Sequence, residues 1–318
     1  MPRLECRWEH KSRNTVGVYD ITCYLKNFYF LRAGNESYKV EHILLKANRF
    51  KQAIYRGELR IAVSPITTKD VLNVREYTKD NREYISVEPF SQSAEEELKK
   101  RILNMICRAE AEEADLLLFP EILGTKSIQE EIEAALYENE SEYPRMTICP
   151  SIWKRNKNSC RILDEMGMLL AEQEKHFGAQ LGGKLEDIKS NQKVYLFHCE
   201  GIGRIAVLIC MDFLVNTYRE FVVKELKATL VLVPSYSSGE YNFETKAMNY
   251  MDLDCQVIWI NCCSAAKGKN EPITLRYGAG RKGVYRERKM VNELCGEHCT
   301  GECLWIYEIE LEGGTQER

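Results

Sequence analysis

Residues 203–213, GRIAVLICMDF, combine a buried strand with a reactive group. The segment 204–209 is mostly branched and apolar, which is typical of a strand covered on both faces of a sheet. A thiol at Cys210 and a carboxylate at Asp212 follow directly. Functional residues of α/β proteins gather where such strands end, so Cys210 stands at a position that favours chemistry.

Other apolar runs alternate with helical patterns on both sides of this stretch. We predict buried strands at residues 59–63, 115–119, 228–233 and 256–261, and helices at residues 217–226 and 244–252. Ser93 and Glu96 form a capping box that predicts the start of another helix. This alternation predicts an α/β fold whose sheets are covered on at least one face.

The domain organisation follows from where the alternation begins. The chain has 318 residues, of which 44% are hydrophobic and 29% charged, the balance of a globular protein. We interpret residues 1–57 as an N-terminal extension that could dock a partner, and residues 58–318 as the main domain. Within the extension, apolar spacing predicts a helix over residues 40–55.

Charge and hydropathy exclude several classes of protein. The net charge of −4 gives no whole-chain electrostatic reason to expect nucleic-acid binding. Residues 1–14 are too charged for a signal peptide, and no apolar run approaches the roughly 20 residues of a membrane helix. The sequence therefore predicts a cytoplasmic protein. A basic segment, residues 276–289, suggests a surface that binds an anion or nucleic acid. A run of charges of this kind is more often a solvated loop.

The 13 cysteines predict free thiols, since the number is odd and no export signal is visible. For one cluster near the C-terminus, zinc binding is an alternative interpretation. Its ligands would be Cys295, His298, Cys299 and Cys303. Its C-x3-C-x3-C spacing is not that of paired zinc knuckles. We therefore expect a cysteine-rich loop there and no metal.

Three polar residues follow predicted strands and form a set suited to acyl transfer. Glu121 follows DLLLFP, Lys175 follows GMLLAEQE and Cys210 follows RIAVLI. A nearby lysine favours the thiolate of a cysteine, and a nearby glutamate can accept its proton. Periodicity alone does not show that these three side chains meet.

In this order the three segments resemble the nitrilase (carbon–nitrogen hydrolase) superfamily. LLLFPE matches the family's glutamate segment, GMLLAEQEK its lysine segment, and GRIAVLICMD its cysteine pattern GR-I-hydrophobic-C-x-[DE]. The resemblance extends over residues 58–311. It implies a four-layer α-β-β-α sandwich, often dimerised through helices. It also implies a Glu-Lys-Cys triad of Glu121, Lys175 and Cys210 with no metal or organic cofactor.

The resemblance also suggests residues around the triad. Many members have a second glutamate between lysine and cysteine, for which Glu186 is the candidate and Asp187 the competitor. The N–H of Met211 could stabilise an oxyanion, and Asp212 could orient the nucleophile loop. Tyr236 could line the pocket or be an ordinary loop aromatic.

The sequence departs from the family pattern at two places. Met211 stands where an aromatic residue is usual. Members often have the pattern R-A-x-E-N in the helix before the last core strand. Here only the acidic residue of that pattern is kept, as Asp252. These changes leave the subfamily, and therefore the substrate, open.

We predict a homo-oligomeric hydrolase of a small amide or carbamoyl substrate, cleaving a non-peptide carbon–nitrogen bond through a thioester on Cys210. A nitrile substrate is disfavoured, because the family's true nitrilases usually have tryptophan and glutamate after the cysteine. Two alternatives stay open. The domain could be an effector or scaffold of a larger assembly, for example in bacterial defence, with residues 1–57 contacting a protein partner. It could also be an acyltransferase that uses the same triad.

Overall fold

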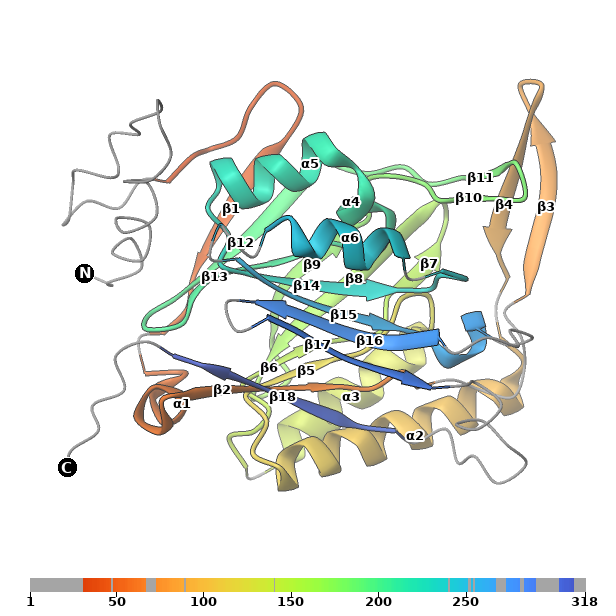
Figure 1. Ribbon diagram of the computed structural model, residues 1–318. Coiled ribbons are helices and arrows are strands. Elements are labelled where there is room, and N and C mark those ends of the chain that lie inside the picture. The colour runs from red at the N-terminus through yellow and green to blue at the C-terminus, as the bar shows by residue number, and fades with distance from the viewer. Residues whose placement is uncertain are drawn as a thin grey trace, which may run out of the picture.

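The computed structural model describes residues 31–46, 48–66, 73–88, 90–139, 141–239, 241–250, 253, 255–266, 273–280, 283–289 and 303–311. Its frame is a pair of seven-stranded sheets that lie face to face (Figure 1). The first sheet has the order β1 (Lys39–Leu44), β12 (Lys193–Cys199), β13 (Gly203–Val207), β14 (Leu230–Ser235), β15 (Gln256–Asn261), β16 (Ile273–Gly280) and β17 (Gly283–Lys289).

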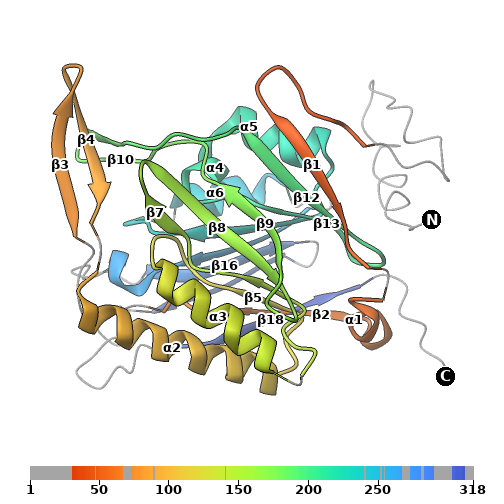
Figure 2. The same cartoon turned by 180° about the vertical axis from the view of Figure 1, so that it is seen from behind.

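The second sheet has the order β18 (Trp305–Glu310), β2 (Glu58–Val63), β5 (Leu116–Leu118), β6 (Met146–Ile148), β8 (Lys157–Asp164) and β7 (Ile152–Lys154), with β9 (Leu169–Glu174) also paired to β8. A smaller, four-stranded sheet has the order β10 (Gln180–Leu181), β11 (Lys184–Glu186), β4 (Arg82–Val87) and β3 (Val74–Lys79). It lies to one side of the two large sheets (Figure 2).

Helices complete the outer layers. On the second sheet lie α2 (Gln92–Ala111) and α3 (Lys126–Glu138), and on the first lie α4 (Met211–Leu214), α5 (Asn216–Glu220) and α6 (Tyr241–Met248) (Figures 1 and 2). A short helix, α1 (Lys51–Arg56), precedes β2. The chain thus forms the predicted four-layer α-β-β-α sandwich.

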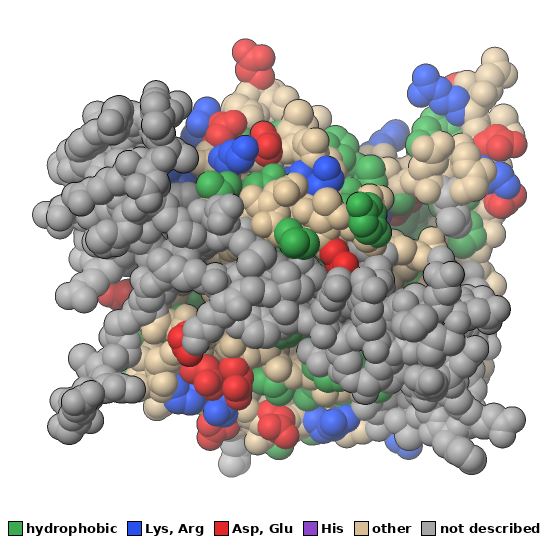
Figure 3. All heavy atoms as spheres, viewed as in Figure 1, with side chains coloured by type: hydrophobic (Ala, Val, Ile, Leu, Met, Phe, Trp, Pro, Cys, Tyr) green, Lys and Arg blue, Asp and Glu red, His purple; other side chains and the backbone are tan. Residues whose placement is uncertain are grey.

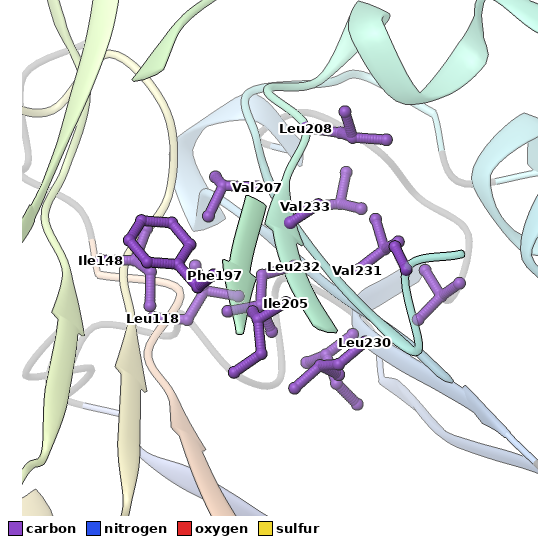
Figure 4. Packing of buried hydrophobic residues seen from close by; sticks show 14 of the residues in the cluster. Leu118, Ile148, Phe197, Ile205, Val207, Leu208, Leu230, Val231, Leu232 and Val233 are labelled. Carbon is purple, nitrogen blue, oxygen red and sulfur yellow. The ribbon is translucent and has the colours of Figure 1, made fainter. Parts of the chain in front are cut away.

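Alternation along the strands divides the core in two. Ile61 and Val63 of β2 belong to the cluster between the sheets, whereas Ala62 belongs to the cluster under α2 and α3. Successive side chains of a strand point to opposite faces, so a strand buried on both faces reads as continuously apolar. Figure 4 shows Leu118 and Ile148 of one sheet lying toward Phe197 of the other.

The predicted helix over residues 40–55 is wrong. Its first part is strand β1, which pairs in parallel with β12 over its whole length, and its last part is the short helix α1. Ladder hydrogen bonds at the open edge of the sheet outweigh the helical spacing of a few apolar residues. Part of the predicted extension is thus built into the sandwich, and its docking role stays a prediction.

Three further expectations need correction. The cap of α2 is Ser91, whose Oγ accepts from the N–H of Ala94 at 3.3 Å, and not Ser93. The helix predicted at residues 217–226 changes at Phe221 into a π-helical turn. The basic segment 276–289 is not a loop, since β16 and β17 form a hairpin that extends the first sheet from β15.

Among the described residues, no helix combines the length and the apolar character required to span a bilayer. Acidic and basic side chains are interspersed over the described part of the face seen in Figure 3. The described part of this face therefore does not present a broad field of one charge.

Candidate active site

Cys210 occupies a sharp turn between β13 and α4. Its backbone has φ +48° and ψ −104°, a region that residues other than glycine rarely adopt. The turn is held because the N–H of Cys210 donates to the carbonyl of Pro234 at 2.9 Å, and the N–H of Phe213 donates to the carbonyl of Cys210 at 3.0 Å. Strained backbone of this kind is found most often at functional sites.

Glu121 lies fully buried beyond the end of β5. Its Oε1 accepts hydrogen bonds from Lys175 Nζ at 2.6 Å and from Asn158 Nδ2 at 2.8 Å. Its Oε2 accepts from the backbone N–H of Tyr236 at 3.0 Å. The carboxylate is therefore fixed in orientation by donors from three separate segments.

Lys175 follows β9 and is also buried. Its N–H donates to the carbonyl of Asn158 at 2.7 Å, which ties it to β8. Its Nζ lies 2.6 Å from Glu121 Oε1 and 2.6 Å from Glu186 Oε2, so one ammonium bridges two carboxylates. A buried cation needs such partners, because an unpaired charge in the interior is very costly.

The thiol of Cys210 completes this arrangement, close enough to Glu121 and Lys175 for both to act on its pKa. Burial raises the pKa of the Cys210 thiol above its usual value, Glu121 raises it further, and Lys175 opposes both. Burial also raises the pKa of Glu121, against the influence of Lys175. For Lys175, burial acts to lower the pKa, but Glu121 and Glu186 outweigh it and hold the pKa well above its usual value.

Asn158 is a site residue that the sequence analysis missed. It is buried on β8, and its Nδ2 donates to Glu121 Oε1 at 2.8 Å and to Glu186 Oε1 at 3.4 Å. Its Oδ1 has no hydrogen-bond partner among the residues that the structure describes. Asn158 stands between Lys157 and Ser159 at the polar start of β8, so no apolar pattern marks it as a buried residue.

Of the two candidates for a second glutamate, Glu186 contacts Lys175 and Asp187 lies against other residues. Glu186 Oε2 accepts from Lys175 Nζ and from the N–H of Ala179 at 3.0 Å. The carboxylate of Asp187 instead accepts hydrogen bonds from Tyr77 and from Asn156. The structure thus brings together the predicted residues Glu121, Lys175, Glu186 and Cys210.

Solved structures show where this architecture occurs. An amidase from Nesterenkonia sp. matches with a TM-score of 0.54 at 15% identity, over 82% of this chain and 93% of that chain. A mutant of the Nesterenkonia AN1 amidase, described as from the nitrilase superfamily, matches with the same TM-score and identity, over 82% of this chain and 94% of that one.

This chain has the nitrilase-superfamily fold. A glutamine-dependent NAD+ synthetase from Acinetobacter baumannii also matches, with a TM-score of 0.54 at 14% identity, over 79% of this chain and 45% of that chain. In sequence, no family model matches the chain, and no curated protein matches it either.

In this nitrilase-type fold, Asp212 joins the cysteine turn to the lysine segment. Its buried Oδ1 accepts from the N–H of His176 and the N–H of Phe177, each at 2.9 Å. Asp212 is two residues after Cys210, and His176 directly follows Lys175. The carboxylate therefore fixes the backbone of the lysine relative to that of the thiol.

Met211 and Tyr236 stand at the margin of the site. The N–H of Met211 begins α4 next to the thiol, and no described residue accepts a hydrogen bond from it. Tyr236 contributes its backbone N–H to Glu121, while its hydroxyl lies 3.5 Å from Ser264 Oγ. Its predicted role in lining the pocket stays a prediction.

Most residues of the suggested zinc cluster lie outside the described part of the chain, and so does Asp252. Cys295, His298, Cys299 and Asp252 are not among the described residues, whereas Cys303 is. Within the described residues, histidine, cysteine and carboxylate side chains form no group suited to a metal ion. Zinc binding by this segment therefore stays untested.

Proposed function

We propose that this protein is a nitrilase-superfamily hydrolase of a non-peptide carbon–nitrogen bond in a small amide or carbamoyl compound. The observation that carries this proposal is the contact of Lys175 with Glu121 and Glu186, next to the thiol of Cys210. A base, a cation and a nucleophile in contact form the set of groups that acyl transfer requires.

In the proposed reaction, Cys210 Sγ attacks the substrate carbonyl while Glu121 accepts the thiol proton. Negative charge develops on the carbonyl oxygen, where Lys175 and the N–H of Met211 can stabilise it. As the carbon–nitrogen bond breaks, Glu121 returns the proton to the departing nitrogen, which leaves as amine or ammonia. The thioester on Cys210 is then hydrolysed by water that Glu121 activates, and this step restores the thiol.

Electrostatics suit an attack in which proton transfer and bond formation are linked. Because burial and Glu121 raise its pKa, the Cys210 thiol is protonated at neutral pH in the free protein. The thiolate then forms only as its proton moves to Glu121. This arrangement keeps the nucleophile protected until a carbonyl is present.

The solved amidases support the proposed substrate class. Forms of the Nesterenkonia enzyme contain butyramide, or the acetamide moiety of fluoroacetamide added covalently at the active-site cysteine. Both are small amides. We extend this class to the present chain on the basis of its Glu121, Lys175 and Cys210 geometry.

The test is incubation with a panel of small amides and carbamoyl compounds, followed by mass spectrometry of the intact protein and its peptides. We expect an acyl adduct on Cys210 and release of the corresponding acid, both absent in Cys210→Ala. Addition of a competing amine separates hydrolysis from acyl transfer, because a transferase converts the amine into a new amide. Turnover undiminished in Cys210→Ala would overturn the mechanism.

A further inference from the structure

A two-stranded arm, formed by β3 and β4, projects from the sandwich beside the active-site face. Its strands pair from Val74↔Val87 to Lys79↔Arg82 and are joined by Asp80 and Asn81. Both turn residues have positive φ, 50° and 60°, as a tight hairpin requires. Figures 1 and 2 show the arm extending away from the two large sheets.

The arm is attached to the sandwich through the strand that ends in Glu186. β4 pairs in parallel with β11, with Tyr84 opposite Leu185 and Ile85 opposite Glu186. The N–H of Asp187 continues this contact by donating to the carbonyl of Ile85 at 3.1 Å. The backbone on both sides of the Glu186 side chain is therefore held by the arm.

Asp187 adds a side-chain contact to this attachment. Its buried carboxylate accepts a hydrogen bond from the hydroxyl of Tyr77 on β3, and one from Asn156 Nδ2 at 2.6 Å. Lys79 Nζ lies 4.0 Å away. Hydrogen bonds to a buried carboxylate are among the stronger ones, so this contact resists movement of the arm.

The side chains of Asp187 and Glu186 make contacts with different parts of the molecule. Asp187 contacts the arm, and Glu186 contacts Lys175, Asn158 and Ala179 in the active site. A displacement of the arm would therefore move the backbone that carries Glu186. Its carboxylate would then leave the 2.6 Å contact with Lys175.

We propose that the β3–β4 arm is a positioning element of the active site, which holds Glu186 against Lys175 through the contact between Tyr77 and Asp187. This inference rests on the proposed function, in which Glu186 sets the charge around Cys210. The arm does not touch the reacting atoms. Any ligand or protein that moved the arm would change the reactivity of the thiol.

The test uses alkylation of Cys210 by iodoacetamide as a function of pH, read by peptide mass spectrometry so that other cysteines do not interfere. Burial and Glu121 raise the pKa of the Cys210 thiol and Glu186 adds to them, so Glu186→Gln should shift the pH profile of labelling to lower pH and make labelling at a fixed pH below that pKa about threefold faster or more. Tyr77→Phe and Asp187→Asn should shift it in the same direction by less. Either substitution suffices if the other fails to fold.

The matched control is Tyr84→Phe. Tyr84 stands opposite Tyr77 in the same hairpin, and its ring stacks on that of Tyr77 at 5.9 Å, but its hydroxyl has no hydrogen bond to Asp187. Its labelling profile should overlay that of the wild type. In the double variant Tyr77→Phe/Glu186→Gln, the first substitution should add nothing to the second, because both act through one carboxylate.

The outcomes separate this inference from the proposed function. If Glu186→Gln shifts the profile but the Tyr77 and Asp187 variants do not, or if the double variant shows additive shifts, the arm has no positioning role while the proposed function stands. If Glu186→Gln leaves the profile unchanged, the proposed role of Glu186 fails, and that of the arm fails with it.

Discussion

The side-chain amide of Asn158 donates to Glu121 Oε1 at 2.8 Å, on the same oxygen that accepts from Lys175 Nζ. This contact identifies the amide nitrogen, because a carbonyl oxygen turned toward two carboxylates would be repelled. Hydrogen bonds to the charged form of a carboxyl favour ionisation. Asn158 therefore helps to keep Glu121 able to accept a proton.

The first prediction concerns Asn158. Asn158→Leu should slow formation of the Cys210 adduct by about 10- to 100-fold, because Glu121 and Glu186 lose their shared neutral donor. Asn158→Asp should slow it more, because a third carboxylate would repel the charges of Glu121 and Glu186 and favour their protonated forms. The measurement is the rate of adduct formation by mass spectrometry. Ser159→Ala, whose hydroxyl contacts Glu172 instead, should retain the wild-type rate. Equal rates for Asn158→Leu and the wild type would contradict the assignment.

The second prediction concerns the clamp formed by Asp212. Asp212→Asn keeps the size of the side chain but removes its charge, and it places an amide NH2 where Oδ2 accepts from the N–H of His176 at 3.1 Å. We expect a loss of about 1–3 kcal/mol in the free energy of unfolding and a slower reaction at Cys210. Urea unfolding and adduct formation measure the two effects. An unchanged reaction rate together with lower stability would make Asp212 a purely structural residue.

The third prediction is a dependence of stability on pH that arises from His198. Burial lowers the pKa of His198 from 6.5 to about 4, with a further lowering by Arg204. Between these values the unfolded chain binds a proton that the folded chain does not, so this histidine makes the free energy of unfolding fall as the pH falls. His198→Gln removes that contribution. The free energy of unfolding of the variant, relative to that of the wild type, should therefore increase by up to about 3 kcal/mol as the pH is lowered from 7 to 4.

Urea unfolding of both proteins at several pH values measures this difference. The variant also loses the contact between His198 Nε2 and His42 Nδ1, which is 2.8 Å long in the wild type. Parallel curves for the variant and the wild type would contradict a lowered pKa for His198.

Much of the sandwich could be predicted from the sequence, because strands buried on both faces read as continuous apolar runs. The strands β13 and β14 are examples, and the convergence of Glu121, Lys175 and Cys210 was expected from the family resemblance. The edge strand β1 could not be predicted in this way, because it is only partly buried and its apolar residues have helical spacing. Only its partner, β12, decides its conformation.

The arm and the choice of Glu186 were also beyond the pattern of the sequence. β3 is largely exposed and no residue of β4 is buried, so neither shows the clear alternation of apolar and polar residues that indicates a strand. Glu186 and Asp187 are adjacent carboxylates at the end of β11, and composition does not distinguish them. Their roles differ because β11 pairs with β4, which is a contact between segments about a hundred residues apart.

The last prediction returns to the start of β13. Gly203 has φ +134°, and a Cβ atom added there would lie 1.9 Å from Thr229 Oγ1. Thr229 in turn accepts from the N–H of Arg204 at 2.8 Å, so it cannot move without breaking that bond. Gly203→Ala should therefore lower the free energy of unfolding by about 3 kcal/mol or more, from strain and displacement together.

Gly182→Ala is the matched control, since Gly182 also has a positive φ, +57°, but has no atom within 4 Å of an added Cβ. Its cost should be about 1 kcal/mol, from backbone strain alone. Urea unfolding of the two variants measures the difference. Because β13 leads directly to Cys210, Gly203→Ala should also slow adduct formation, whereas equal costs for the two variants would show that Thr229 yields to the new methyl group.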